Sequence, residues 1–304
     1  MRRLVRVELR RLWTRRLVRW SLLGVFLGIL AAPVLVPWAF SEQARINHDA
    51  DIERCVQDQP PKTRDGVTMP TVPSDVAAPT ERDRLCRQVT PTLDPDFHLR
   101  QLDEIYRTTA ALLIIGGFLI GASSIGADWQ AGVIPTVLTW EGRRLRMYTA
   151  RLVALVTAVF AAVVAWQALL AASVVPYALV KDTTDGTGTD WLRSITGLGL
   201  RVAAVGAAAA AFGYALALIG RGTAAALGIG FAYLFVFENV VGSQFTPLRP
   251  WLMLWNALVV VKGTFEAGGD VPNRTVTAAA AVLSVWAAAI ILGAAAVFSR
   301  RDIA

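Results

Sequence analysis

The feature that most constrains this chain is a series of six apolar runs, each about as long as a membrane-spanning helix. The runs cover residues 20–40, 108–126, 150–178, 198–220, 223–242 and 275–298. A helix needs about 20 apolar residues to cross a hydrocarbon core of roughly 30 Å. With 55% hydrophobic and 17% charged residues, the chain carries more apolar surface than a soluble fold can bury. We therefore expect an all-α integral membrane protein with six transmembrane helices.

Charged residues at the ends of the runs indicate their orientation. Residues 1–19 contain eight arginines and one acidic residue, Glu8, and Arg300 and Arg301 follow the last run. Because positively charged flanks remain on the cytoplasmic side, both termini are predicted to be cytoplasmic. The loop of residues 41–107, in which acidic residues outnumber basic ones, is then extracytoplasmic. The net charge of +7 is concentrated at these flanks, which favours an orientation signal over nucleic-acid binding.

The first 19 residues have the pattern of a basic amphipathic helix. Leu9, Trp13 and Leu17 recur at helical spacing among the arginines. Such a helix lies flat on an anionic inner leaflet, so membrane lipid is an expected partner. A signal peptide also places an apolar run after basic residues. The run that follows here is of spanning length and has no clear cleavage site, which favours the amphipathic helix.

Both cysteines and both histidines lie in the predicted outer loop. Cys55 and Cys86 are in a compartment where thiols oxidise, so we expect a disulfide that closes about 30 residues. Two unpaired thiols are the alternative. His48 and His98 are far apart in sequence and have no partner at ligand spacing, so no metal site is predicted.

Three polar residues within or beside the runs are candidates for lining a transport pathway. Gln167 could bond to another helix, either across a pathway or within its own bundle. Arg201 lies at the outer start of the fourth run and either lines a pathway or extends its guanidinium to the outer headgroups. Glu238, near the outer end of the fifth run, is either functional or paired with a cation such as Arg249 or Arg201.

Glycines and prolines indicate how some of the runs are arranged. Gly117 and Gly121 form a GxxxG pair, which allows another helix to approach closely. Residues 220–222, Gly-Arg-Gly, predict a tight inner turn between two antiparallel helices. The apolar stretch within residues 248–262 is too short to cross and is predicted to be an outer interfacial or re-entrant segment.

The segment of residues 127–148 differs from the runs on either side of it. It carries Arg143, Arg144 and Arg146 against Asp128 and Glu141, and its apolar residues are scattered. A basic segment of this kind lies at or below the headgroups on the cytoplasmic side. It is too short to be a domain, so contact with a partner is its expected role.

Motifs for catalysis and nucleotide binding are absent from the sequence. It contains no GxxxxGK[ST], HExxH, GxSxG or CxxC. No histidine lies within a run to activate a serine, and Glu238 is the only acidic candidate for a proton relay. We expect no catalytic residue and no bound cofactor in this chain. The energy for any transport must then come from a partner.

Two stretches of the chain resemble a known family of membrane proteins. The sequence reads GADWQAGVIPTVLTWEGRRLRMYTARL at residues 126–152 and FSRRDIA at residues 298–304. Together with the six runs, these stretches resemble the permease subunits of ABC transporters of the ABC-2 type. Asp128 matches the family's acidic position, and Arg143 and Arg144 match its basic pair. The family's usual proline is replaced by Glu141 and Gly142.

The resemblance implies a set of partners and a surface for one of them. Residues 1–19 would be a connecting helix before an ABC-2 transmembrane domain of residues 20–304. The segment of residues 127–148 would dock onto a separate ATPase subunit, present in two copies, that binds ATP and magnesium. A second permease chain would complete the assembly. The implied contact residues are Asp128, Trp129, Gly132, Thr136, Thr139, Glu141, Arg143, Arg144 and Arg146.

The sequence as a whole favours a transporter subunit over two rivals. We expect a permease in a bacterial inner membrane that exports an amphipathic or hydrophobic compound. Arginine carries nearly all the positive charge and alanine is abundant, which is typical of GC-rich bacterial genomes. The first rival is a self-sufficient channel or secondary carrier. The second is a membrane anchor or sensor whose outer loop binds a ligand.

Overall fold

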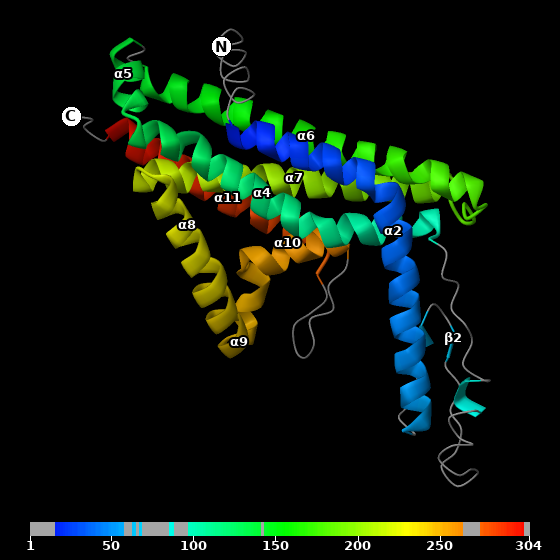
Figure 1. Ribbon diagram of the computed structural model, residues 1–304. Helices are drawn as coiled ribbons and strands as arrows, with labels where there is room; N and C mark the ends of the chain where they lie inside the picture. The colour runs from blue at the N-terminus through cyan, green and yellow to red at the C-terminus, as the bar shows by residue number, and fades with distance from the viewer. Residues whose placement is uncertain are drawn as a thin grey trace. The chain divides into compact units, whose positions relative to one another are not determined.

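The computed structural model is almost entirely helical in the residues it describes (Figure 1). Those residues are 16–57, 63–64, 67–68, 85–87, 97–140, 143–263 and 274–300. Within them, five helices are long and apolar enough to cross a membrane. The five are Leu99–Gln130, Arg144–Val180, Thr189–Gly220, Thr223–Gln244 and Val276–Arg300. The chain is therefore a multi-pass helical membrane protein.

The remaining predicted crossing, residues 20–40, lies inside a longer helix, α2 (Arg16–Val56). That residues 20–40 cross the membrane, and that both termini are cytoplasmic, stay predictions. Residues 1–15 of the predicted connecting helix and residues 301–304 lie outside the described residues.

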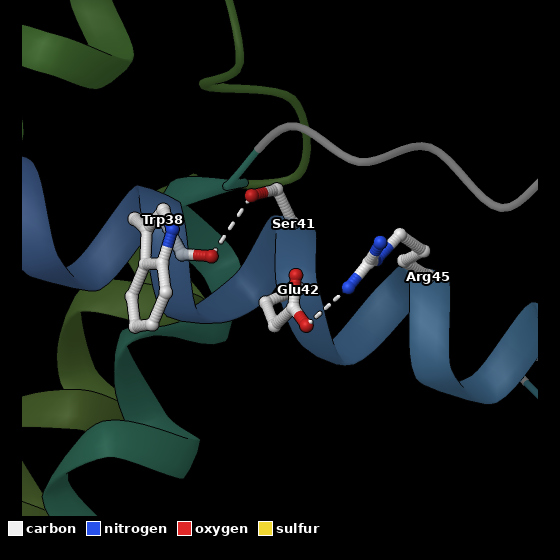
Figure 2. A network of polar contacts seen from close by, with 4 residues as sticks. All are labelled: Trp38, Ser41, Glu42 and Arg45. Atoms are coloured by element: carbon white, nitrogen blue, oxygen red, sulfur yellow. Dashed lines mark hydrogen bonds and ion pairs between the residues drawn. The ribbon is translucent and has the colours of Figure 1, made fainter.

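Helix α2 continues through residues that we predicted to be outer loop. Residues 41–56 contain neither glycine nor proline, so nothing in them interrupts the helix. The Ser41 hydroxyl donates to the Trp38 carbonyl at 2.8 Å, and Arg45 pairs with Glu42 at 2.7 Å one turn further on (Figure 2). The first residues of the predicted outer loop are thus helical, because their polar composition is compatible with a solvated helix; the extracytoplasmic placement of residues 41–107 stays a prediction.

The chain divides into two compact units, the smaller of which comprises Gly28–Gln101 and Ala172–Gly186. In this unit Cys55 and Cys86 form a disulfide that is buried with Ile52. The Phe40 and Phe97 rings pack edge to face with centroids 5.1 Å apart. Two-residue strands, β1 (Thr63–Arg64) and β2 (Val67–Thr68), pair antiparallel.

The end of the long helix α6 (Arg144–Val180) also belongs to the smaller unit. Here the Thr183 hydroxyl donates to the Phe97 carbonyl at 2.8 Å. The Leu99 amide, in the 3₁₀ turn η1 (Leu99–Gln101), donates to the Thr183 carbonyl at 3.0 Å. These bonds join the start of η1 to the residues that follow α6.

The larger unit is built on helix α4 (Leu102–Gln130), which lies along helix α7 (Thr189–Gly220) (Figure 1). The two backbones approach so closely that a Cβ atom on Gly121 would overlap the Ala210 carbonyl oxygen. The carbonyl of Gly206 similarly faces Gly117. The GxxxG pair therefore contacts a helix of the same chain.

The remaining elements of the larger unit follow a sharp turn after α7. Arg221 adopts φ 55°, and α8 (Thr223–Phe231) begins two residues later, as the tight turn predicted. A π-helix, η2 (Ala232–Val241), and the short α9 (Gly242–Gln244) complete this span. Next come η3 (Thr246–Trp251) and α10 (Met253–Lys262), in the region predicted to be interfacial or re-entrant, and then α11 (Val276–Arg300).

Candidate functional site

The described part of the segment of residues 127–148 consists of three helical pieces. Helix α4 runs on to Gln130, and a turn follows in which Gly132 has φ 66°, a conformation that favours glycine. A short helix, α5 (Val133–Trp140), comes next, and α6 begins at Arg144. Glu141 and Gly142 lie outside the described residues.

A buried ion pair joins α4 to α6 at the base of this segment. An Asp128 carboxylate oxygen lies 2.9 Å from an Arg151 guanidinium nitrogen, with both side chains less than a tenth exposed. Charges taken out of water need such a partner, because desolvation otherwise destabilises them by several kcal/mol. We had expected Asp128 to contact a partner subunit. Its carboxylate faces Arg151 instead of the surface, so we assign it to the joint between the two helices.

A second joint ties the end of α4 to the turn between α7 and α8. The Arg221 guanidinium lies over the Trp129 ring, 5.5 Å from its centroid. A Cβ atom on Gly126 would overlap Thr223, so the two backbones are in close contact here. Trp129 therefore packs against the chain's own α7–α8 turn, and its contact with a partner stays a prediction.

The start of α6 is held by a third set of contacts. The buried Tyr148 hydroxyl donates to the Ile291 carbonyl of α11 at 2.9 Å. Its ring lies 5.7 Å from the Tyr214 ring of α7 and 6.4 Å from the Phe298 ring of α11, between centroids. The first turns of α6 are thus connected to both helices.

Between these joints, the segment exposes a basic surface that we define by Arg143, Leu145 and Arg146. All three are exposed, and Leu145 is 50% exposed although it is apolar. Arg144 is only half-buried and has interactions within the chain. Arg143 and Arg146 are therefore exposed charges that a partner could bind, and an exposed apolar residue lies between them in the sequence.

The threonines of the segment make local bonds. Thr136 donates to the Gly132 carbonyl at 3.1 Å, and Thr139 donates to the Thr136 carbonyl at 2.7 Å. Both residues are exposed, but their hydroxyl protons are directed to the backbone of α5. Ile134 is fully buried and anchors α5 to the rest of the unit.

Two of the three polar candidates for a pathway are engaged within the helices of the larger unit. Gln167 is buried, its side-chain oxygen lies against Gly199, and its backbone carbonyl accepts from the Tyr106 hydroxyl at 2.6 Å. Arg201 is half-buried and its Nε donates to the Gly197 carbonyl of its own helix at 3.2 Å. Both positions fit packing between α4, α6 and α7.

Glu238 does not make the ion pair that was considered for it. The side chain is 2% exposed, and its Oε1 accepts from the Leu254 amide of α10 at 2.7 Å. Arg249, one of the two cations considered, donates instead to the Gly242 carbonyl at 2.6 Å and lies over the Trp255 ring. The carboxylate is therefore bound by a helix backbone.

Sequence reasoning missed several residues of this site. Arg151 could have been found, because it is a lone charge at the edge of the predicted 150–178 span and needs a partner. Arg221 was noticed only as part of a turn. Nothing in the sequence pattern pointed to Tyr148, whose role depends on how α6, α7 and α11 pack.

Comparison with known proteins leaves the family open. No protein-family model, no curated protein and no solved structure matches this chain. Among the described residues, no group of three or more His, Cys, Asp or Glu side chains is placed to hold a metal ion. The fold defines the chain as a multi-pass helical membrane protein, and the arrangement around residues 127–148 is the basis for a proposal on its function.

Proposed function

We propose that this chain is the membrane-spanning subunit of an ATP-driven transporter, of the ABC-2 type that its sequence resembles. The observation that carries the proposal is the exposed basic surface of Arg143, Leu145 and Arg146, located between helices that are joined by buried contacts. A partner bound at this surface could transmit its movement to the helices through these buried contacts. ATP and magnesium would be bound by the partner.

Three joints would distribute a force applied at the basic surface. Through Asp128 and Arg151 the force would reach α4 and α6 together. Through Trp129 and Arg221 it would reach the turn between α7 and α8. Through Tyr148 it would reach α11. A movement of a few ångströms at the segment would therefore act on several membrane helices at once.

The chemistry of the basic surface indicates the kind of groove that would receive it. Two arginines are best matched by carboxylates, with which guanidinium groups form bidentate bonds. Leu145 between them calls for an apolar contact in the same groove. Two ATPase subunits and two membrane chains, in a bacterial inner membrane, would form the assembly. An amphipathic or hydrophobic compound is the proposed cargo, moved outward.

A photo-crosslinking experiment tests the partner. We would replace Arg143 by benzoylphenylalanine, irradiate membranes of the organism that encodes the chain, and label the product with azido-ATP. The expected product is an adduct whose partner polypeptide takes up the nucleotide label. The matched position is Arg193, an exposed arginine at the opposite end of α7 from Arg221, where no labelled adduct should form.

A charge reversal then tests the coupling. The double variant Arg143→Glu/Arg146→Glu should lose stimulation of the partner's ATPase by the membrane chain, while the chain still inserts and elutes as a folded species. Arg193→Glu should keep the stimulation. An adduct at Arg143 that binds no nucleotide would contradict the proposal and favour a sensor or anchor. Ion-driven transport by the purified chain alone would favour a channel or secondary carrier.

A further inference from the structure

The span after the α7–α8 turn is wound as a π-helix over its second half. Residues Ala232–Val241 have this wider winding, and the Asn239 side-chain amide donates to the Leu234 carbonyl, five residues earlier, at 2.9 Å. In an α-helix, residues five apart point in directions about 140° apart. The wider turn of a π-helix brings such residues toward one face. Tyr233 and Glu238 are five residues apart and are brought together in this way.

Both side chains bind the first turn of α10. The Met253 amide donates to the Tyr233 hydroxyl oxygen at 3.3 Å, and the Leu254 amide donates to Glu238 Oε1 at 2.7 Å. The two acceptors therefore bind neighbouring amides of the same turn. The first amides of a helix have no partner within it, and a negative charge is stabilised there. Glu238 and Tyr233 therefore supply from another helix the cap that α10 lacks locally.

Helix α10 is packed deeply into the larger unit. Val259 and Val260 are buried in a cluster with Val205 of α7 and Ala279 of α11. A second contact supports the same end of α10, because Gly242, directly after η2, lies against Leu252 and the Trp255 ring. The position of α10 thus depends on η2 at its first turn and on α7 and α11 along its length.

We propose that Glu238 and Tyr233 are positioning residues that hold α10 in its packed place, and that they can do so only while η2 keeps its π-helical winding. Rewinding η2 as an α-helix would turn the Glu238 carboxylate away from the Leu254 amide and release the first turn of α10. In the proposed transporter, and resting on that proposal, α10 would close its end of the helix bundle until η2 rewinds.

Labelling of a buried cysteine tests the hold on α10. The two native cysteines are joined to each other, so Val260→Cys introduces a single free thiol in a buried position of the cluster. The rate of its reaction with N-ethylmaleimide is measured on the purified chain in detergent. Adding Glu238→Ala should raise this rate by about tenfold or more, because a hydrogen bond to a charged group is lost. Tyr233→Phe should raise it less.

Two further variants separate a positioning role from general loss of structure. Glu238→Gln keeps an oxygen that can accept from the Leu254 amide, so it should restore slow labelling. Val236→Ala changes an exposed residue of the same π-helix and should leave the rate unchanged. Equal rates in the Glu238→Ala and parent chains would overturn the inference. So would fast labelling in Val236→Ala. The labelling assay contains no ATPase, so neither result bears on the proposed function, which the crosslinking and charge-reversal experiments test separately.

Discussion

The buried pair of Asp128 and Arg151 allows a quantitative test of how the basic surface is supported. The two groups are 2.9 Å apart and the side chains are only 8% and 5% exposed. Removing one partner takes the ion pair away from a charge that stays buried, which costs about 3–5 kcal/mol. We therefore expect Asp128→Ala and Arg151→Ala each to destabilise the chain by roughly that amount.

A surface pair in the same unit provides the comparison. Arg107 and Asp103 lie 3.2 Å apart with both side chains 38% exposed. Solvent screens such a pair, and an exposed ion pair between residues one helical turn apart stabilises a protein by only about 0.3–0.5 kcal/mol. Arg107→Ala should therefore have an effect several times smaller than Arg151→Ala, although both remove an arginine from an ion pair.

The assay is equilibrium unfolding in mixed micelles, followed by tryptophan fluorescence for the two single variants and for the double variant Asp128→Leu/Arg151→Met. The double variant replaces both charges with apolar groups and should be close to the parent in stability. The losses in unfolding free energy of the two single variants should therefore sum to much more than the loss in the double variant. Single effects below about 1 kcal/mol, or simple additivity, would refute the reasoning that the pair is a buried joint.

Two further predictions concern packing and covalent bonds. Gly121→Ala should weaken the α4–α7 interface by about 1–3 kcal/mol, because its methyl group would overlap the Ala210 carbonyl. Gly116→Ala on the same helix meets nothing within 4 Å and should instead stabilise α4 by about 0.5–1 kcal/mol, with thermal unfolding of both variants as the measurement. Replacing Cys55 and Cys86 by serine should cost the smaller unit about 3–4 kcal/mol. Faster limited proteolysis within residues 41–107 would report that loss, and an unchanged cleavage rate would contradict it.

Much of the helical architecture could be predicted because long apolar runs have few alternatives in a membrane. Helices α4, α6 and α7 contain the runs at 108–126, 150–178 and 198–220, and α11 contains all but the first residue of the run at 275–298. Helix ends were less accessible to prediction. Composition separates lipid from water but does not separate a solvated helix from a loop, which is why the continuation of α2 to Val56 was missed.

The polar contacts of the site were harder to predict than the helices. Asp128 was predicted to contact a partner, but a sequence motif gives no information on which way a carboxylate faces, and burial beside Arg151 depends on how α4 and α6 pack. Glu238 was predicted to be either functional or paired with a side-chain cation. Its partner is a backbone amide that only the π-helical winding brings within reach, and that winding left no pattern in the sequence.

The glycine contacts between α4 and α7 have a mechanical consequence. Two backbones in such close contact cannot move closer or slide past each other without steric overlap, and moving apart would lose their packing contacts. Among the helices long enough to cross a membrane, α7 is the most buried, and Thr223–Gln244 and α11 are the least. Because they have the fewest packing contacts to lose, we expect these two helices to move more readily than the α4–α7 pair.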